Sequence, residues 1–561
     1  PFMTLHNLDG TWRFRLHGKP TSSAPRGLDL KKWRRAEMPG TLHYALERAG
    51  VIPDAFYGCN ELDLQWIDEQ DWEMARSVKV TEEDLRKSRQ ELLFEGVDTV
   101  AEYFLNGHRL GTSANMFRSV EFDVSGKLKA GENEIRIVLK SPTAYTAQRA
   151  SRSSLKLPRL GTHFDWQTGE TRANHRSWIR KNQCQFGWDW GPYLAVSGLW
   201  LPSRLECSDA PRWASLTVRQ IHHGPSGHPT RVELQLTGRM VSSTPRSGAV
   251  TFEAAGRGIR VETRLKKGEN EIFASLTLEK PQLWWPAGQG PQHLYELRAT
   301  WSDADGVATP FVKRLGLRTL ELVTKKDRSP KGQPSESFCF KVNGRPIFLK
   351  GGDFIPCDAY VDRCTPGVTR HLLTSMVEAN MNAVRSWGGG WYEPDSFYDL
   401  CDELGLLVWQ DFKMACAIYP DSPELMREYE AEVRYQVRRL QSHACVALWC
   451  GDNENLSGIR HWWARLPESP RLKRVYARVM GLVGKTCRAE DPTRRFWISS
   501  PSNGSLVGEP DDPNRGDVHY WKVWHGGRPF SDYLTVKSRF TSEFGFQSFP
   551  EPATLDAVLP P

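Results

Sequence analysis

The sequence lacks several features that would place it in a class of protein at once. No apolar run approaches the roughly 18 residues that a membrane-spanning helix needs, and the first residues show no signal-peptide pattern. The 11 cysteines are dispersed and odd in number, and no Cys-x-x-Cys pair occurs. This argues against both a disulfide framework and a zinc site. We expect no metal and no cofactor, and the compartment stays open among periplasmic, secreted and lysosomal-type locations.

An excess of charge of one sign is also missing. The 74 basic and 67 acidic residues leave a net charge of +7, and the basic residues are scattered along the chain. Scattered charge is typical of a solvated surface, whereas nucleic-acid binding needs a basic patch or stripe. We therefore expect neither a nucleic-acid nor a membrane partner. The oligomeric state is not determined by the sequence.

Short alternating runs, separated by turn signals, fill the first part of the chain. The run Ala101–Leu105 ends at Asn106-Gly107, which is the strongest local signal for a β-hairpin. Because 561 residues exceed what one hydrophobic core supports, several domains are expected. We predict a β-sandwich over residues 1–205 and a smaller, immunoglobulin-like sandwich over residues 206–322.

From residue 323 to residue 561 the pattern changes to strands that alternate with helices. This alternation indicates βαβ units and a parallel sheet, and seven such strands predict a (β/α)8 TIM barrel. Ser422–Gln441 is predicted to be a long amphipathic helix. The predicted strands are 347–350 running into 351–354, then 383–387, 406–410, 446–449, 496–499, 518–521 and 539–542.

Two glutamates follow this strand pattern closely. Glu454 comes just after the fourth strand, in the sequence LWCGDNEN, and Glu543 lies at the end of the seventh, in FTSEFGFQ. The carboxyl ends of barrel strands share one mouth, so both side chains should meet there. Glycosidic bond cleavage needs such a pair, one carboxyl holding a proton and the other ionised.

The same count of strands leaves the predicted barrel short. Only 18 residues follow Glu543, whereas a closed barrel needs a further helix, strand and helix. An open barrel would leave unpaired strand edges. These seven strands alone therefore form an incomplete barrel. Either the chain is a piece of a longer protein, or another segment completes the barrel.

An ordered set of motifs along nearly the whole chain resembles glycoside hydrolase family 2, and within it the β-mannosidases. The resemblance implies an N-terminal jelly-roll sandwich of the sugar-binding type, an immunoglobulin-like sandwich and the catalytic barrel. Besides the two glutamate motifs, the markers are LDGTW (8–12), GVDTVA (96–101), LNG (105–107), NMFR (115–118), FGWDWGP (186–192), WWPAG (284–288), VNGRPI (342–347), NAVRSWGG (382–389) and WQDF (409–412).

The resemblance also implies roles for residues near the two glutamates. Glu454 would be the general acid and base, and Glu543 the nucleophile of a retaining mechanism. Asn453 would bind the 2-hydroxyl of the sugar, and Tyr520 would lie near the nucleophile, unless it is a core aromatic. Asp452 departs from the family, which has Asn at this position, and its effect on the acid is left open.

One loop and three further residues are candidates for binding the sugar. The resemblance implies that Trp188, Asp189 and Trp190 form a rigid loop that contacts the terminal mannose; a latch between domains is the alternative. Trp387 is a candidate stacking platform, and Arg385 a candidate to orient a catalytic carboxylate, although both could lie in the barrel core. Trp521 is likewise a candidate for the site that could instead lie in the barrel core.

The leading function is hydrolysis of terminal non-reducing β-D-mannose from manno-oligosaccharides or glycans by a retaining exo-β-mannosidase. Another enzyme of the family, an endo-β-mannosidase or an exo-β-glucosaminidase, is the nearer alternative. A non-catalytic carbohydrate-binding protein is an alternative of a different class, but the presence of both glutamates argues against it.

Overall fold

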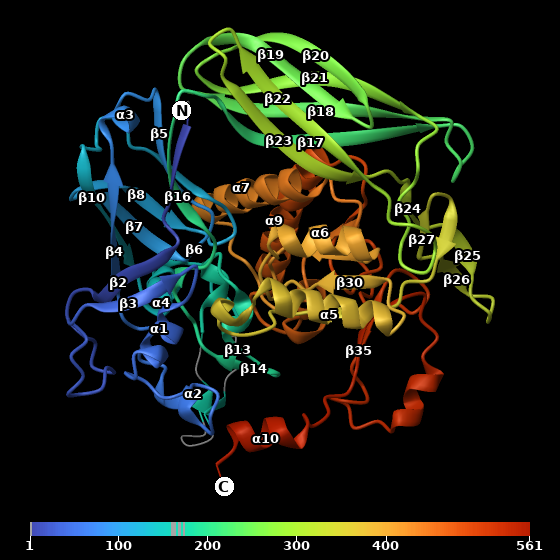
Figure 1. Cartoon of the computed structure of the whole chain (residues 1–561). Helices are drawn as coiled ribbons and strands as arrows, with labels where there is room; N and C mark the ends of the chain where they lie inside the picture. Colours follow the sequence, from blue (N-terminus) through green and yellow to red (C-terminus); the bar gives the residue numbers. More distant parts are fainter. Residues whose placement is uncertain (1–2, 159–163, 166–169, 172–173, 561) are drawn as a thin grey trace. The chain divides into compact units, whose positions relative to one another are not determined.

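The computed structural model describes residues 3–158, 164–165, 170–171 and 174–560 (Figure 1). The chain forms two compact units. The first consists of Pro1–Asp209, Pro356–Thr365 and Ser548–Pro561, and the second of Ala210–Ile355 and Pro366–Gln547. The finer domain boundaries expected near residues 205 and 322 stay predictions.

An antiparallel sandwich dominates the first unit. One sheet contains, in spatial order, β1 (Met3–Asn7), β16 (Ser203–Ser208), β5 (Arg89–Phe94) and β9 (Val120–Asp123). The other contains β3 (Arg34–Met38), β2 (Gly10–Leu16), β4 (Trp72–Val80), β10 (Gly131–Leu139), β7 (Val100–Leu105) and β8 (His108–Ala114). Alternate residues of β2, such as Trp12 and Phe14, are buried, because successive side chains of a strand point to opposite faces. They share one core with Leu92 and Leu205 of the other sheet.

The loops of this sandwich carry short elements. They include the hairpin of β13 (Phe186–Trp188) and β14 (Gly191–Tyr193), whose tip carries three of the residues predicted to bind the sugar. The others are α1 (Leu42–Arg48), α2 (Asn60–Asp63), α3 (Glu82–Leu85), β6 (Val97–Asp98), α4 (Pro142–Arg152), β11 (Phe164–Asp165), β12 (Glu170–Thr171), η1 (Arg176–Trp178), η2 (Gln183–Gln185), β15 (Gly198–Leu199), η3 (Val361–Arg363) and α10 (Pro552–Val558).

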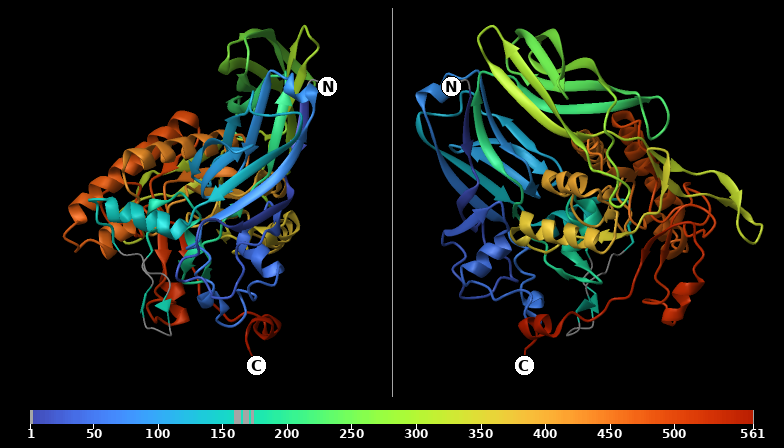
Figure 2. Two further views of the ribbon diagram at one scale, coloured as in Figure 1. Left: turned by 90° about the vertical axis from the view of Figure 1, so that its left-hand side faces the viewer. Right: turned by 45° about the vertical axis from the view of Figure 1, so that its right-hand side comes forward.

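The second unit begins with two further antiparallel sheets around a core that includes Trp213, Phe252 and Trp301. One sheet has the order β17 (Arg212–His223), β18 (Arg231–Ser242), β21 (Gly268–Glu279). The other has β20 (Arg257–Leu265), β19 (Arg246–Ala254), β22 (Leu294–Asp303) and β23 (Ala308–Gly316), drawn in green in Figures 1 and 2. Short antiparallel strands then lead on: β24 (Leu320–Val323), β25 (Lys326–Arg328), β26 (Pro334–Glu336), β27 (Cys339–Val342) and β28 (Arg345–Ile347).

The rest of the second unit alternates strands and helices, as its sequence predicts. Five parallel strands pair in chain order: β29 (Gly351–Phe354), β30 (Ala383–Ser386), β31 (Leu407–Asp411), β32 (Val446–Cys450) and β33 (Phe496–Trp497). A second parallel pair is formed by β34 (Val518–Tyr520) and β35 (Thr541–Phe544). One expectation is corrected: Ile347 does not begin the first parallel strand, because β28 pairs antiparallel with β27.

Helices lie between these strands where the sequence places them. They are α5 (Pro366–Glu378), α6 (Asp395–Leu404), α7 (Pro423–Leu440), α8 (Asn455–Ser457), η4 (Gly458–Trp462), α9 (Ser469–Glu490) and η5 (Phe530–Thr535). The hydroxyl of Ser422 caps α7 by accepting from the backbone N–H of Leu425, which explains its start. The orange helices α7 and α9 pack against each other (Figures 1 and 2).

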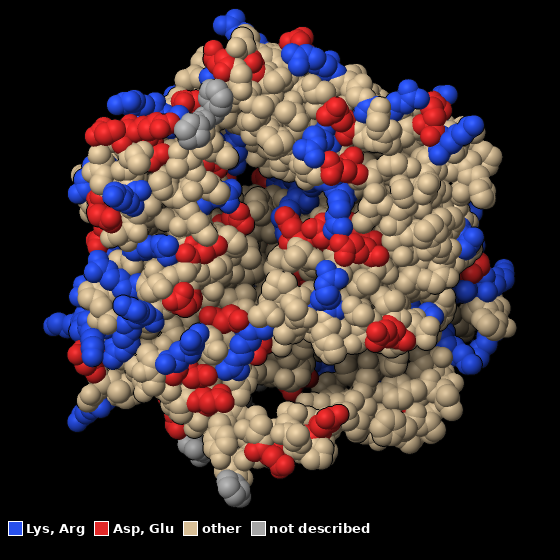
Figure 3. Space-filling model, viewed as in Figure 1, with Lys and Arg blue, Asp and Glu red and all other residues tan. Residues whose placement is uncertain are grey.

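The surface agrees with the mixed composition. Acidic and basic side chains are interspersed over most of the face shown in Figure 3. In the described part of the chain, no helix combines the length and the apolar character required to cross a membrane.

Candidate active site

Glu454 lies in the loop between β32 and α8, and its backbone is unusual. Its φ of 61° is left-handed, which is costly for a residue with a side chain. Backbone hydrogen bonds hold the loop on both sides. The backbone N–H of Asn453 donates to the carbonyl of Met414 (2.9 Å), and the backbone N–H of Glu454 donates to the carbonyl of Ser500 (2.8 Å). A strained residue that its neighbours fix this firmly suggests a functional position rather than a loose surface loop.

Glu543 is the third residue of β35, and its side chain is buried. Its carboxylate accepts from the guanidinium of Arg385 (2.7 Å) and from the indole N–H of Trp521 (3.0 Å). Burial raises the pKa of Glu543 and the charge of Glu454 acts in the same direction, whereas Arg385 and the indole N–H of Trp521 lower it. Two carboxyls so close together titrate as a pair, so that one carries the proton more readily than the other.

The two glutamates converge on the ring of His519. Its Nδ1 atom lies 2.7 Å from Glu454 and 3.3 Å from Glu543. The three atoms concerned, one from each residue, all lie within 4.8 Å of one another. A retaining glycosidase needs its two carboxyl groups about 5–5.5 Å apart, and an inverting one needs a wider gap for water. The spacing thus suits retention.

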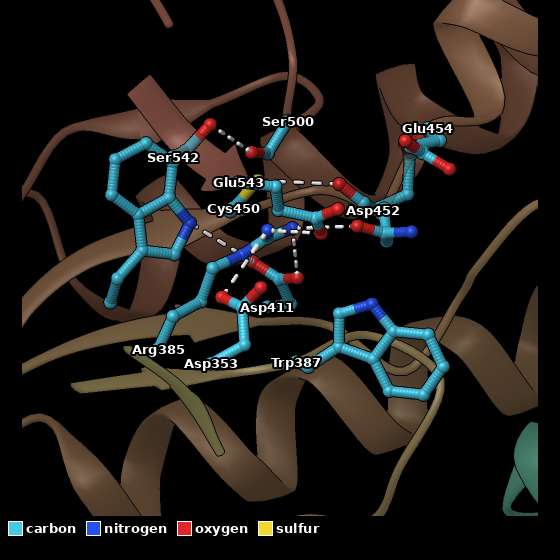
Figure 4. Close-up of polar contacts among 12 residues, drawn as sticks. Asp353, Arg385, Trp387, Asp411, Cys450, Asp452, Glu454, Ser500, Ser542 and Glu543 are labelled. Carbon is cyan, nitrogen blue, oxygen red and sulfur yellow. Dashed lines mark hydrogen bonds and ion pairs between the residues drawn. The ribbon is translucent and has the colours of Figure 1, made fainter. Parts of the chain in front are cut away.

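Arg385, at the third position of β30, ties this cluster together (Figure 4). Besides Glu543, its guanidinium donates to the side chains of Asp411 and Asn453, each at 2.8 Å. Burial opposes its charge, but Asp411, Asp353 and Glu543 raise the pKa of Arg385 well above its ordinary value. The planar guanidinium can hold several acceptors in fixed directions, so it sets the orientation of Glu543 relative to Asn453.

Trp387 follows β30 and is buried, with its ring at the edge of the cluster (Figure 4). Two glycines next to it explain the local sequence. A Cβ atom at Gly389 would lie 1.9 Å from the Trp387 ring, and one at Gly388 would lie 3.2 Å from the Cβ of Asn453. The SWGG run therefore leaves space for the indole and for the loop that carries Asn453.

Asp452, left open by the sequence, turns away from the carboxylate pair. Its carboxyl accepts from the hydroxyls of Ser499 (2.6 Å) and Tyr476 (2.9 Å) and from the backbone N–H of Asn455 (3.1 Å). Burial raises the pKa of Asp452 to about 7. Its hydrogen bonds to Ser499 and Tyr476 fix the loop that carries Glu454.

One placement differs from the expectation for the nucleophile. The phenol of Tyr520 donates to Asp532, not to Glu543. Successive side chains of β34 point to opposite faces, so His519 and Trp521 face the glutamates while Tyr520 faces away. His519 is not among the residues predicted from the sequence, although this alternation, applied to the run VHYW, indicates it.

The remaining candidates lie in the first unit, at the tip of the β13–β14 hairpin. Trp188 is half-buried, with the guanidinium carbon of Arg176 4.8 Å from its ring centre. Asp189 is exposed, and Trp190 is 38% exposed. The centroids of the two indole rings are 6.4 Å apart, and Asp189 lies between these two residues in the sequence.

The group formed by Glu454, His519 and Glu543 also has the residue types of a metal site. However, Arg385 already places a positive charge 2.7 Å from Glu543, which opposes the approach of a second cation. The expectation of a site without metal stays a prediction.

Comparison with known proteins places the chain among glycoside hydrolases. Residues 12–201 match the family model described as glycosyl hydrolase 2 galactose-binding domain-like, and residues 217–318 match the model of glycosyl hydrolases family 2. The goat (Capra hircus) β-mannosidase is 36% identical over 93% of this chain. β-Mannosidase B of Thermothelomyces thermophilus is 33% identical over 99%.

A solved structure agrees with these relatives. The β-D-mannosidase of Dictyoglomus thermophilum has a TM-score of 0.89 at 35% identity and covers 99% of this chain and 64% of its own. An exo-chitosanase of Amycolatopsis orientalis, at 18% identity and a TM-score of 0.66, shows likeness of fold alone. The chain spans 60% of the length of the goat relative.

The predicted resemblance is thereby confirmed. The first sandwich is a galactose-binding-like domain, within a β-rich multidomain structure similar to that of a β-mannosidase. Models of glycosyl hydrolases family 2 thus match residues 12–201 and 217–318, and the relatives that the chain resembles over almost its whole length are β-mannosidases.

Proposed function

We propose that this chain carries the catalytic residues of a retaining exo-β-mannosidase, which removes terminal non-reducing β-D-mannose from manno-oligosaccharides or glycans. The observation that carries the proposal is the approach of Glu454 and Glu543: one carboxylate oxygen of each lies within 4.8 Å of one of the other. The names of the relatives supply the choice of mannose.

In the proposed reaction, Glu543 attacks the anomeric carbon while Glu454 protonates the departing oxygen. The resulting glycosyl-enzyme is then hydrolysed by water, from which Glu454 takes a proton. Arg385 and Trp521 direct hydrogen bonds at Glu543 and so favour its ionised form. Asn453 is fixed by Arg385 and is proposed to bind the 2-hydroxyl, where a contact strengthens in the transition state.

We also propose that β29–β35 are seven strands of a (β/α)8 barrel. Strands β29–β33 pair in parallel in chain order, β34 pairs in parallel with β35, and helices lie between most of these strands; these features support the proposal. A cavity of about 670 Å³ is lined by residues of both outer strands, β29 and β35, and by Trp409 and Ala447 between them. A further strand in this cavity would close the barrel.

The hairpin residues Trp188, Asp189 and Trp190 are proposed to bind the terminal sugar, with Asp189 accepting from its hydroxyls. Trp387 and Trp521 are proposed to line the pocket. Tyr520 has a weaker claim, because its phenol is engaged with Asp532.

The test is hydrolysis by the full-length protein. We expect cleavage of 4-nitrophenyl β-mannoside, with β-mannose as the first product seen by proton NMR. Preference for the matching β-glucosaminide would favour the other family activity, and release of the α-anomer would contradict the retaining mechanism. Binding of manno-oligosaccharide without turnover would support the non-catalytic alternative.

A further inference from the structure

A buried network behind the carboxylate pair begins at Asp517, just before β34. Its carboxylate accepts four hydrogen bonds: from the indole N–H of Trp497 (2.7 Å), the backbone N–H of Ser502 (3.0 Å), and the hydroxyls of Ser500 and Ser542 (2.6 Å each). An ionised carboxylate only accepts hydrogen bonds. Ser500 Oγ also lies 3.2 Å from Ser542 Oγ, but the shortest contact of each hydroxyl is the one to Asp517, so we assign the hydroxyl hydrogen of each serine to that carboxylate.

The direction of the Ser500 hydroxyl determines which nitrogen of His519 carries hydrogen. Ser500 Oγ lies 3.1 Å from His519 Nε2. Because the hydrogen of Ser500 is used on Asp517, its oxygen presents a lone pair to the ring, and Nε2 must be the donor. Burial lowers the pKa of His519 to about 4, so the ring is neutral near pH 7. A neutral ring with hydrogen on Nε2 has a bare lone pair on Nδ1.

That lone pair faces the two glutamates unequally. Glu454 Oε1 is 2.7 Å from Nδ1, a separation that requires a proton between the atoms. Glu543 Oε2 is 3.3 Å away, and the carboxylate of Glu543 already accepts from Arg385 and Trp521. The proton between Nδ1 and Glu454 therefore belongs to Glu454.

We infer that His519, fixed as the Nε2–H tautomer by Ser500 and Asp517, is a positioning residue that keeps the proton on Glu454 and not on Glu543. This inference rests on the proposed function, in which Glu454 is the acid. When a substrate enters, Glu454 exchanges its hydrogen bond to His519 for one to the departing oxygen and transfers its proton there. His519 gains and loses no proton in this step.

The other groups around the ring are consistent with this assignment. The backbone N–H of His519 donates to Asp511 (3.0 Å), whose pKa burial raises to about 6. Arg385 disfavours a positive charge on the ring, while Glu543 and Asp517 favour one, and burial outweighs both. On its other oxygen, Glu454 lies 3.2 Å from the thiol of Cys416.

The decisive variant is Ser500→Ala, which removes a hydroxyl that is bonded to neither glutamate and keeps the backbone carbonyl that accepts from Glu454. Without the serine oxygen, the ring can adopt the Nδ1–H tautomer, which donates to Glu454 and favours its ionised form. The basic limb of the kcat/KM profile reports the pKa of Glu454, which this hydrogen bond lowers. We expect the limb to move to lower pH by about one unit, the size of effect that one hydrogen bond to a charged group has on a pKa. His519→Ala should move it in the same direction.

Ser542→Ala is the matched control, because Ser542 binds the same oxygen of Asp517 but not the ring. Its basic limb should keep its position. At a pH above the limb, Ser500→Ala should lose about tenfold more activity on an alkyl mannoside than on 4-nitrophenyl β-mannoside, whose leaving group needs little protonation.

A second measurement does not depend on the variants being folded. Nitrogen-15 NMR of the native protein should show an unprotonated Nδ1 and a protonated Nε2 for His519 near pH 7. A protonated Nδ1, or an unmoved basic limb in folded Ser500→Ala and His519→Ala, would overturn the inference. If Glu454→Gln retains full activity, the proposed function itself fails, which separates the two cases.

Discussion

The carboxylate cluster of the second unit and the hairpin tip of the first differ most in exposure. Glu543, Arg385 and Asn453 are all buried, and each has a partner fixed by a short hydrogen bond. Asp189 and Trp190 at the hairpin tip are exposed. Chemistry that depends on the proton position needs groups held rigidly in a dry site, whereas recognition of a sugar needs groups that can reach it. Variants in the two regions should therefore fail in different ways.

The largest effect is expected for Glu543→Gln. The amide keeps the shape but cannot form the glycosyl-enzyme, so kcat for 4-nitrophenyl β-mannoside should fall by more than about 10⁴-fold. The measurement is steady-state kinetics of the full-length protein, with circular dichroism as the check of folding. A folded variant with near-normal turnover would remove the nucleophile from the cluster.

Glu454→Ala should be less severe on an activated substrate. Loss of an acid and base costs about 10²–10⁴-fold, but 4-nitrophenolate leaves without a proton, so slow deglycosylation remains. Azide can then attack in place of activated water. We expect azide to restore turnover and to yield β-mannosyl azide, identified by NMR; failure of azide to increase the rate would contradict the role of Glu454.

Asp189→Ala should sharpen the comparison, because it removes a hydrogen-bonding group without touching the cluster. We expect kcat/KM to fall by about 10–100-fold, as the loss of a hydrogen bond to a charged group implies, with the positions of the pH limbs unchanged. Asp29→Ala, at another exposed carboxylate of the same unit, is the control and should leave kcat/KM unaltered. Equal kinetics of both variants would favour a latch role for the hairpin.

The smallest effect on activity is expected for Asp452→Asn, which should change stability instead. Burial raises the pKa of Asp452 from 3.8 to about 7, so the folded state favours the protonated form. The stability that protonation of Asp452 gives to the folded state is fully present below about pH 4 and is lost as the pH rises through about 7. Asp452→Asn should therefore have a higher Tm than the unchanged protein at pH 8, and the difference in Tm should be smaller at pH 5. An equal difference at both values would contradict this account.

Local patterns predicted much of the fold. The amphipathic pattern from Ser422 to Gln441 placed α7 to within a residue, and the cap that the structure shows at Ser422 explains why the helix begins there. The hairpin at Asn106-Gly107 and the alternation of strands and helices after residue 323 follow from equally local signals. Ile347 was placed in the wrong strand, since a short apolar run does not reveal whether its partner is parallel or antiparallel.

Contacts between distant segments could not be predicted from the sequence in the same way. The carboxyl group of Asp452 turned toward Tyr476 and Ser499, residues 24 and 47 positions away, and nothing in the loop sequence names these partners. Likewise, Tyr520 has the residue type expected beside a nucleophile but lies on the opposite face of its strand. Residue type suggested the role, and the direction of the side chain decided it.

By itself, the sequence determined the two glutamate motifs, their places after strands of a parallel pattern and the family to which they point. Those features depend on residue types and on periodicity along the chain. Only the tertiary structure decided that Glu454 and Glu543 meet at one nitrogen of His519, and that Arg385 pairs with the latter glutamate. Such distances depend on how strands 26 to 158 residues apart are packed together, which no local pattern encodes.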